Sequence, residues 1–202
     1  MRSIYIVDDD DTVRSELRSL LCVYTNTVLR SFSSGDEFLG ELDSLSPALV
    51  LLDMNMPGAS GTDVLAALRD RPDLLAIVVT GQGDMRVAVQ AMKAGAIDFL
   101  EKPCEPQALL QTIDLAFETL EQTEQTIART GQAQRRLACL TARERNVLDA
   151  LIEGKSNKVI GYELDISPRT VEVHRANMMD KLEVRSLSEA LRIAFLAGLI
   201  AT

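Results

Sequence analysis

Five short runs rich in Val, Ile and Leu alternate with segments of helical period through the first 120 residues. At least three of these runs are continuously apolar, which is typical of parallel strands that helices cover on both faces. Five successive strand and helix units predict an α/β fold, a doubly wound five-stranded parallel sheet. The predicted strands are residues 3–7, 27–32, 48–53, 75–80 and 97–101.

Residues 137–202 lack a strand pattern and carry signatures of four short helices. Thr141 and Glu144 have the spacing of a capping box, and Ser167-Pro168 supplies an N-cap followed by a proline at the first helical position. A short helix from Ser156, a tight turn at 165–167 and a longer helix match the helix-turn-helix unit. We therefore expect a small all-α domain with a helix-turn-helix after the α/β domain.

Between these parts, residues 122–136 are rich in Gln, Thr, Glu and Arg, and we divide the chain into domain 1–121, a helical linker 122–136 and domain 137–202. Two interpretations of the linker are open. Ile113, Leu120 and Ile127 fall seven residues apart, a faint heptad with which a second copy could pair. Alternatively, the linker is a solvated helical or frayed connector that breaks near Gly131.

The charge and cysteine content of the chain indicate its cellular compartment and the kinds of partner that it can bind. The chain has a net charge of −9, but residues 1–121 carry −11 and the remainder +2, so the two parts can contact different partners. Three widely spaced cysteines indicate reduced thiols rather than a disulfide framework. No run approaches the roughly 18 apolar residues of a membrane span, and no signal-peptide core is present. These features predict a cytoplasmic protein without membrane contact.

Charged and polar side chains follow the ends of the predicted strands. Asp8 and Asp9 follow the first strand, Asp53 ends the third, Thr80 ends the fourth and Lys102 follows the fifth. In such sheets the carboxyl ends meet at one edge, which is where sites form. Gathered carboxylates repel one another, and a hard divalent cation, most plausibly Mg²⁺, relieves the repulsion. With a lysine and a hydroxyl added, the site is suited to accept a phosphoryl group.

A plainer interpretation exists for each of these residues taken alone. An aspartate run is usually a solvated turn, and Asp10 and Asp11 fit the cap and first turn of a helix. The combination of an acid pair with Asp53, Thr80 and Lys102 at strand ends favours the phosphoryl site over that interpretation.

The first 121 residues resemble a two-component receiver domain, a flavodoxin-like fold, and the whole chain resembles the FixJ branch of the NarL/LuxR-type response regulators. The resemblance rests on short motifs at the ends of the predicted strands and around the fourth predicted helix. These motifs are Ile6-Val7-Asp8-Asp9, Leu51-Leu52-Asp53-Met54-Asn55-Met56-Pro57-Gly58, Val79-Thr80-Gly81-Gln82-Gly83-Asp84, Ala91-Met92-Lys93-Ala94-Gly95-Ala96 and Asp98-Phe99-Leu100-Glu101-Lys102-Pro103.

The resemblance implies a role for each matching residue. Asp53 would accept the phosphoryl group. Asp9, Asp53 and the Asn55 carbonyl would bind Mg²⁺, and Asp8 would join through a water molecule. Thr80 and Phe99 would form a coupled switch, and Lys102 would bind the phosphoryl oxygens. The Lys102-Pro103 peptide bond would be cis.

Cys104 departs from the family, which usually has an aromatic or other apolar residue there. We interpret Cys104 as a small buried hydrophobe rather than a redox sensor.

The second domain resembles the LuxR-type DNA-binding domain over about residues 139–198. The matching segments are 140–148, 154–158 and 166–175. Gly161 departs from the alanine that the family usually has, and a glycine within a helix costs about 1 kcal/mol relative to alanine. The residues expected to contact DNA are Lys155, Ser156, Asn157, Lys158, Arg169, Thr170, Glu172, Val173, Arg175 and Ala176.

The longer helix has two faces. Val171, His174, Met178 and Leu182 recur at helical spacing and form the predicted buried stripe, with His174 as a core residue rather than a metal ligand. The opposite face, with the helix start at Arg169, is expected in a major groove. The lysines near the turn suit DNA phosphates.

Together these patterns predict a phosphorylation-activated transcription regulator, not an enzyme that turns over substrate. The resemblance implies a sensor histidine kinase, promoter DNA and RNA polymerase as partners, and a homodimer on phosphorylation. The alternatives are a DNA-binding regulator that uses its receiver only for dimerisation, and a hydrolase with Asp53 as a transient nucleophile. The complete set of acids, threonine and lysine disfavours the first, and the lack of an insertion that could form a substrate pocket disfavours the second.

Overall fold

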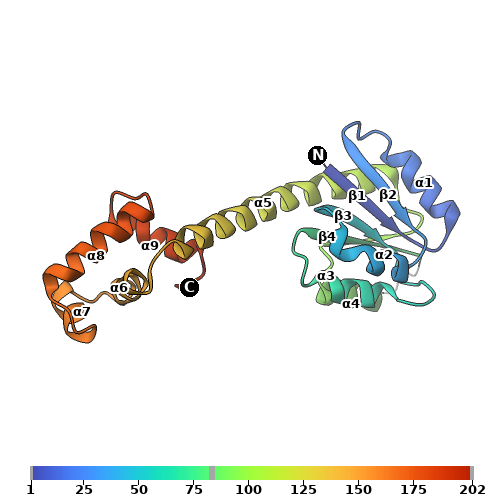
Figure 1. Cartoon of the computed structure of the whole chain (residues 1–202). Coiled ribbons are helices and arrows are strands. Elements are labelled where there is room, and N and C mark those ends of the chain that lie inside the picture. The colour runs from blue at the N-terminus through green and yellow to red at the C-terminus, as the bar shows by residue number, and fades with distance from the viewer. Residues whose placement is uncertain (1, 82–84, 201–202) are drawn as a thin grey trace. The chain divides into compact units, whose positions relative to one another are not determined.

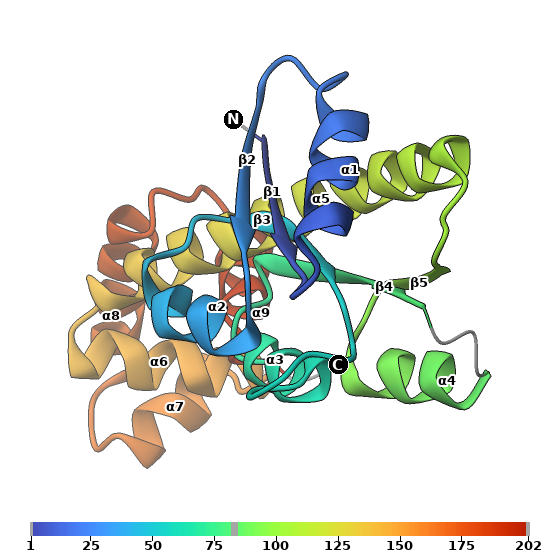
Figure 2. The same ribbon diagram turned by 90° about the vertical axis from the view of Figure 1, so that its right-hand side faces the viewer.

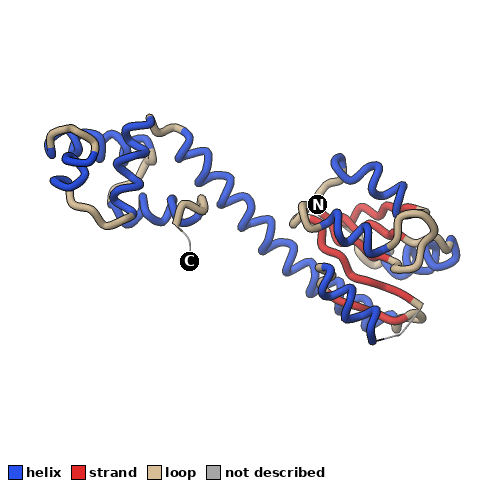
Figure 3. Tube along the Cα trace, turned by 90° about the horizontal axis from the view of Figure 1, so that it is seen from below, coloured by secondary structure: helices blue, strands red, loops and turns tan. Residues whose placement is uncertain are grey.

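A computed structural model of the chain describes residues 2–81 and 85–200. Residues Gln82, Gly83 and Asp84 of one family motif therefore lie outside the described residues. The chain forms two compact units, Met1–Glu124 and Gln125–Thr202, which we describe separately. The strands lie in the first unit, and the described part of the second unit is helical (Figure 3).

The first unit is built on a five-stranded sheet in the order β2-β1-β3-β4-β5, with every neighbouring pair parallel. This confirms the predicted doubly wound fold, and each strand boundary lies within one residue of its expected position. The strands are β1 (Arg2–Val7), β2 (Thr27–Phe32), β3 (Ala48–Leu52), β4 (Leu74–Thr80) and β5 (Asp98–Glu101), as Figure 1 shows.

Helices cover both faces of the sheet (Figure 2). One core packs α1 and α5 against Ile4, Ile6 and their neighbours, and the other packs α2, α3 and α4 against Tyr5, Val7 and theirs. Successive residues of a strand point to opposite faces, so a strand between two helical layers must be apolar at every position. Every residue of β3 is buried for this reason. The helices are α1 (Asp11–Leu21), α2 (Gly35–Glu41), α3 (Gly61–Leu68), α4 (Met85–Ala94) and α5 (Pro106–Ala138), with a 3₁₀ turn η1 (Leu42–Ser44).

The segment that we expected to be a linker is helical throughout. α5 runs 33 residues without a break at Gly131, so the alternative of a connector broken at that glycine is wrong. A single glycine lowers helix stability by about 1 kcal/mol relative to alanine, and the helix-forming residues around Gly131 offset this cost. Of the faint heptad, Ile113 and Leu120 are buried in the core of the first unit, and only Ile127 is exposed.

The second unit contains the end of α5 and four shorter helices around one core. Ala133 and Leu137 of α5 are buried in this core beside Val147, Val171 and Met178. The helices are α6 (Ala142–Ile152), α7 (Asn157–Glu163), α8 (Pro168–Lys181) and α9 (Leu187–Leu196). No helix among the described residues is long and apolar enough to cross a membrane.

Candidate functional sites

The polar residues predicted at the strand ends do meet at the carboxyl edge of the sheet. Backbone hydrogen bonds extend the strand ladders to this edge: the N–H of Asp53 donates to Val7 O at 2.9 Å, and the N–H of Lys102 donates to Thr80 O at 2.9 Å. An open cavity of about 340 Å³ is lined by Asp8, Asp53 and Lys102 together with their neighbours. The parallel topology therefore places residues from four strands in one small volume.

Three carboxylates form the acidic part of this cavity. Asp8, Asp9 and Asp53 each place a carboxylate oxygen within 4.8 Å of the other two. Asp8 is 2% exposed and Asp53 6% exposed, whereas Asp9 is exposed. Oxygen donors at this spacing, with one side open to solvent, fit a hard divalent cation such as Mg²⁺, which retains several waters.

Lys102 is the cation of the cavity. Its Nζ lies 2.5 Å from Asp8 Oδ2 and 3.3 Å from Asp53 Oδ1. The Lys102-Pro103 peptide bond is cis, as expected. Burial opposes the charged form of Lys102, but the hydrogen bond to Asp8 and the attraction of Asp53 outweigh it, so the pKa of Lys102 is raised. The ammonium is therefore charged at neutral pH and is close to the oxygen on which a phosphoryl group would be placed.

Asp53 itself lies in a strained electrostatic environment. Burial raises the pKa of its carboxyl, and the neighbouring Asp8 adds to the effect, while Lys102 and the N–H of Asn55, 3.2 Å from Asp53 Oδ2, partly counteract it. Because burial and Asp8 disfavour the ionised carboxyl, a cation placed beside Asp53 would stabilise its charged form.

The expected switch residues, Thr80 and Phe99, come from β4 and β5. Thr80 is fully buried, and its Oγ1 accepts a hydrogen bond of 3.4 Å from Asn55 Nδ2. Phe99, on β5, is half-buried and packs against the core that contains Val78. Cys104 is half-buried against the other core, and burial raises the pKa of its thiol, which keeps it in the less reactive protonated form.

The loop after Asp53 is held by Asp36, which carried no signal in the sequence, and by the close approach of the backbone at Gly58 and Gly61. Asp36 on α2 accepts a 3.0 Å hydrogen bond from the N–H of Ala59. A side chain at Gly58, where φ is +78°, would place its Cβ 2.1 Å from the same carboxylate oxygen. At Gly61, a Cβ would lie 2.6 Å from Asp53 O. These contacts fix the loop that carries the Asn55 carbonyl, a ligand that the resemblance assigns to Mg²⁺.

We expect Asp36→Ala to weaken Mg²⁺ binding about fivefold, because the loss of one hydrogen bond of about 1 kcal/mol loosens this loop. Asp36→Asn retains an acceptor oxygen and should restore the affinity. Asp70→Ala removes the same charge from an exposed position and serves as the control. Calorimetric titration with Mg²⁺ measures the effect. Equal losses in Asp36→Ala and Asp70→Ala would show that only net charge matters.

The second unit contains the predicted helix-turn-helix, formed by α7, a turn and α8. The turn is tight because Asp165 adopts a φ of +54° and the N–H of Ile166 donates to Gly161 O at 2.9 Å. A Cβ at Gly161 would lie 2.8 Å from Ile166 O and 3.3 Å from Pro168 N. This close approach of the backbone explains why a glycine, rather than a residue with a Cβ, occupies position 161 within α7.

Most residues expected to contact DNA are exposed at the second unit's surface. On α8, Glu172, Val173 and Ala176 face outward, and Arg169 is exposed near its start. Ser156 and Lys158 are exposed at the start of α7. His174 is only half-buried, less than its predicted place in the buried stripe suggests, whereas Val171, Met178 and Leu182 are fully buried.

Four of these residues are already engaged within the unit. Lys155 Nζ lies 2.7 Å from both Glu153 and Glu163, so its charge is neutralised. Arg175 donates to Asn157 Oδ1 at 2.6 Å. The hydroxyl of Thr170 lies 2.8 Å from that of Ser167, the N-cap of α8. The sequence could not reveal the pair of Arg175 and Asn157, because the two residues are 18 positions apart.

Comparisons with known proteins match both domains of the chain. Residues 4–114 match the response regulator receiver domain, and residues 138–194 match the luxR family of bacterial regulatory proteins. The chain is 40% identical over 197 residues to the transcriptional regulatory protein FixJ of Rhizobium meliloti (strain 1021), which covers 97% of this chain and 96% of the relative. It is 38% identical over 191 residues to the response regulator protein TmoT of Ectopseudomonas mendocina, covering 94% and 86% of the two chains.

Solved structures give the same result over nearly the full length. The response regulator StyR has a TM-score of 0.79 and 37% identity, covering 96% of this chain and 98% of its own. Full-length FixJ from B. japonicum has a TM-score of 0.58 and 40% identity, covering 99% and 98%. The chain therefore belongs to the FixJ-like response regulators, in which a receiver domain precedes a luxR-family DNA-binding domain.

Proposed function

We propose that this protein is a cytoplasmic transcription regulator that a sensor histidine kinase activates by transferring a phosphoryl group to Asp53. The observation that carries the proposal is the cavity at the sheet edge, where Lys102 lies 3.3 Å from Asp53 Oδ1 in a chain that also contains a helix-turn-helix. The protein acts stoichiometrically, as a phosphoprotein, rather than by turning over a substrate.

The chemistry follows from the positions of the side chains. Asp53 Oδ1 attacks the phosphorus of the kinase phosphohistidine, the new oxygen–phosphorus bond forms, and the phosphorus–nitrogen bond breaks with its electron pair returning to the imidazole. Lys102 lies close enough to Asp53 to pair with the phosphoryl oxygens. To do so, its ammonium must move partly away from Asp8, which then retains charge for the metal.

The carboxylate cluster of Asp8, Asp9 and Asp53 fits Mg²⁺. By the resemblance, Asp9, Asp53 and the Asn55 carbonyl would hold the cation directly and Asp8 would hold it through water. When bound, the cation would neutralise charge that develops on the transferring phosphoryl group. Asp8 and Asp9 follow the end of β1, so their place at the sheet edge would set the position of the cation beside the acceptor.

Thr80 and Phe99 couple the phosphoryl group to a surface change. The Thr80 hydroxyl leaves Asn55 and donates to a phosphoryl oxygen, and Phe99 moves into the space that Thr80 vacates. The surface of α4, β5 and α5 changes as a result and pairs with a second receiver. A two-state shift of this kind needs only a few kcal/mol of differential stabilisation.

We expect Thr80→Ala to accept phosphate at Asp53 but to dimerise poorly, because the variant lacks the hydroxyl that senses the phosphoryl group. Phosphorylation is followed by intact-protein mass spectrometry and dimerisation by light scattering. Thr80→Ser retains the hydroxyl and is the matched control. Full dimerisation of phosphorylated Thr80→Ala would remove Thr80 from the switch.

Dimerisation matters for DNA binding because residues 137–202 carry equal numbers of basic and acidic residues. Affinity for DNA depends strongly on phosphate contacts by basic side chains, so a single neutral domain binds weakly. Two copies on paired half-sites raise the effective concentration of the second domain. Promoter DNA and RNA polymerase are the partners that complete this proposal.

Arg169 and Lys158 should differ in what they contribute to DNA binding. Arg169 is exposed near the start of α8, the part of the helix that we propose enters the major groove. We therefore expect Arg169→Ala to cost about 1–3 kcal/mol on the preferred site and to relax specificity there. Lys158→Ala should weaken all sequences alike and lower the salt slope by about one phosphate contact. Binding to a site selected in vitro, compared with random DNA at several salt concentrations, measures both.

Tyr162→Ala is the control for these variants, because Tyr162 is exposed on α7 but is not among the expected DNA contacts. Equal losses on selected and random DNA for Arg169→Ala would remove it from the residues that read bases.

The proposal is tested by incubation with acetyl phosphate and Mg²⁺. The expected result is a stable acyl phosphate on Asp53 together with tighter binding to selected DNA. DNA affinity that is already maximal without phosphate, and unchanged by it, would instead support a regulator that uses its receiver only for dimerisation.

A further inference from the structure

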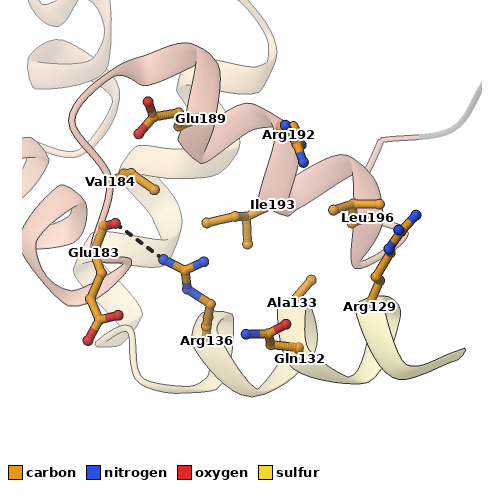
Figure 4. A pocket seen from close by; sticks show the side chains of 10 residues that line it. All are labelled: Arg129, Gln132, Ala133, Arg136, Glu183, Val184, Glu189, Arg192, Ile193 and Leu196. Carbon is orange, nitrogen blue, oxygen red and sulfur yellow. Dashed lines mark hydrogen bonds between the residues drawn. The ribbon is translucent and has the colours of Figure 1, made fainter. Parts of the chain in front are cut away.

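The second unit contains a cavity whose ten lining residues are drawn in Figure 4. It has a volume of about 420 Å³ and lies between the last turns of α5, near residues 129–136, and α9 with the residues just before it. This volume is within the range of about 300–1,000 Å³ that is typical of small-molecule sites.

The floor of the cavity is apolar. Ala133 of α5 and Ile193 of α9 are 4% and 7% exposed, and the half-buried side chains of Val184 and Leu196 complete the lining. In Figure 4, Ile193 and Leu196 project from α9 toward α5, and Ala133 faces them. Because Ala133 is small, it leaves room above α5 that a larger side chain would fill. The floor can therefore take up an apolar group.

The charged groups of the cavity are separated along its length. Arg129 and Arg192 come from the two opposing helices near Leu196, and neither forms an ion pair with any residue that the structure describes. The carboxylates of Glu183 and Glu189 lie toward the other end, as Figure 4 shows, and Glu189 is engaged by the N–H of Arg185 at 2.8 Å.

The third arginine of the cavity, Arg136, is held by hydrogen bonds to the backbone. It donates from Nη2 to the carbonyl oxygens of Leu182 and Glu183, at the end of α8. Two guanidinium groups, those of Arg129 and Arg192, are thus left near an apolar floor without a carboxylate partner. Guanidinium groups bind carboxylates in a bidentate manner, and a shared anion relieves the repulsion between two like charges.

We propose that this cavity binds a small organic monocarboxylate with an apolar body. The body lies on Ala133, Ile193 and Leu196, and the carboxylate pairs with Arg129 and Arg192. Such a ligand joins the last turns of α5 to α9 and stabilises the second unit by mass action. None of the residues expected to contact DNA lines the cavity, so the ligand and DNA bind the same protein together.

The test uses three probes on the full chain at constant ionic strength and neutral pH: benzoate, acetate and benzyl alcohol. Benzoate has both the charge and the apolar body, and each of the others lacks one. We expect saturable binding of benzoate in ligand-observed NMR and calorimetry, and affinities for acetate and benzyl alcohol that are at least roughly tenfold lower. Acetate that binds as well as benzoate would overturn the role of the floor, and benzyl alcohol that binds as well would overturn the role of the arginines.

Variants locate the site. Arg129→Ala and Arg192→Ala should each lower benzoate affinity about tenfold, because each removes charged hydrogen bonds. Alanine is the best helix former, so both variants should fold, which circular dichroism checks. Arg143→Ala removes an exposed arginine of the same unit outside the cavity and should leave benzoate affinity unchanged. Absence of saturable benzoate binding to the wild-type protein, or equal losses in all three variants, would contradict the proposal.

Discussion

Asp53→Asn abolishes phosphorylation by acetyl phosphate and leaves the fold unchanged. The amide is almost the same shape as the carboxylate, and it can still accept the hydrogen bond from the N–H of Asn55. It is not a nucleophile toward phosphorus, so no acyl phosphate can form. Intact-protein mass spectrometry after incubation with Mg²⁺ and acetyl phosphate measures the effect, and Asp70→Asn, an exposed aspartate, is the control.

The same variant has a second expected property, a gain in stability without Mg²⁺. Burial raises the folded-state pKa of Asp53 above its ordinary value, so ionisation near neutral pH disfavours the folded state. Asn carries no such penalty. The urea midpoint of Asp53→Asn should therefore exceed that of the wild type at pH 7, and the difference should shrink as the pH falls toward the ordinary pKa of aspartate. Stoichiometric phosphorylation of the variant at another carboxylate would contradict the assignment of Asp53.

Asp9→Ala is expected to weaken Mg²⁺ binding at least tenfold and to slow phosphorylation in parallel. Loss of a group that merely supports a ligand typically costs 10- to 100-fold in metal affinity, and Asp9 is proposed as a direct ligand. Because Asp9 is exposed and Asp8 and Asp53 keep their contacts with Lys102, the fold should survive. Calorimetric titration with Mg²⁺ measures the affinity.

Asp10→Ala is the matched control for this variant, because Asp10 is the adjacent exposed acid and accepts a hydrogen bond from the N–H of Thr12 as the N-cap of α1. It should lose some helix stability but little Mg²⁺ affinity. Undiminished Mg²⁺ affinity in Asp9→Ala would place the metal elsewhere.

The sequence predicts the sheet and the cavity residues well because both depend on simple geometric rules. Continuous apolar runs require two covered faces, and parallel strands bring their carboxyl ends to one edge. These two rules place Asp8, Asp53 and Lys102 together from the sequence alone. The sequence does not predict the continuous course of α5 past Gly131, because a glycine disfavours a helix by about 1 kcal/mol relative to alanine.

Contacts between distant side chains could not be predicted in the same way. Asp36 accepts a hydrogen bond from the N–H of Ala59, which is 23 residues away in the sequence. An acidic residue in the first turn of a helix is common without any such contact to a distant loop. The neutralisation of Lys155 by Glu153 and Glu163 depends on how α7 packs against the preceding turn. Only the folded structure reveals which charges remain available to DNA.

A phosphoryl group on Asp53 is proposed to control assembly of the protein. Sedimentation velocity of the wild-type protein at micromolar concentrations, with and without beryllofluoride and Mg²⁺, measures this control, because beryllofluoride mimics the phosphoryl group on a carboxylate. We expect a monomer that becomes a dimer when beryllofluoride is added, together with tighter binding to selected DNA. A mass that stays that of a monomer, alongside an increase in DNA affinity, would mean that activation does not require receiver pairing.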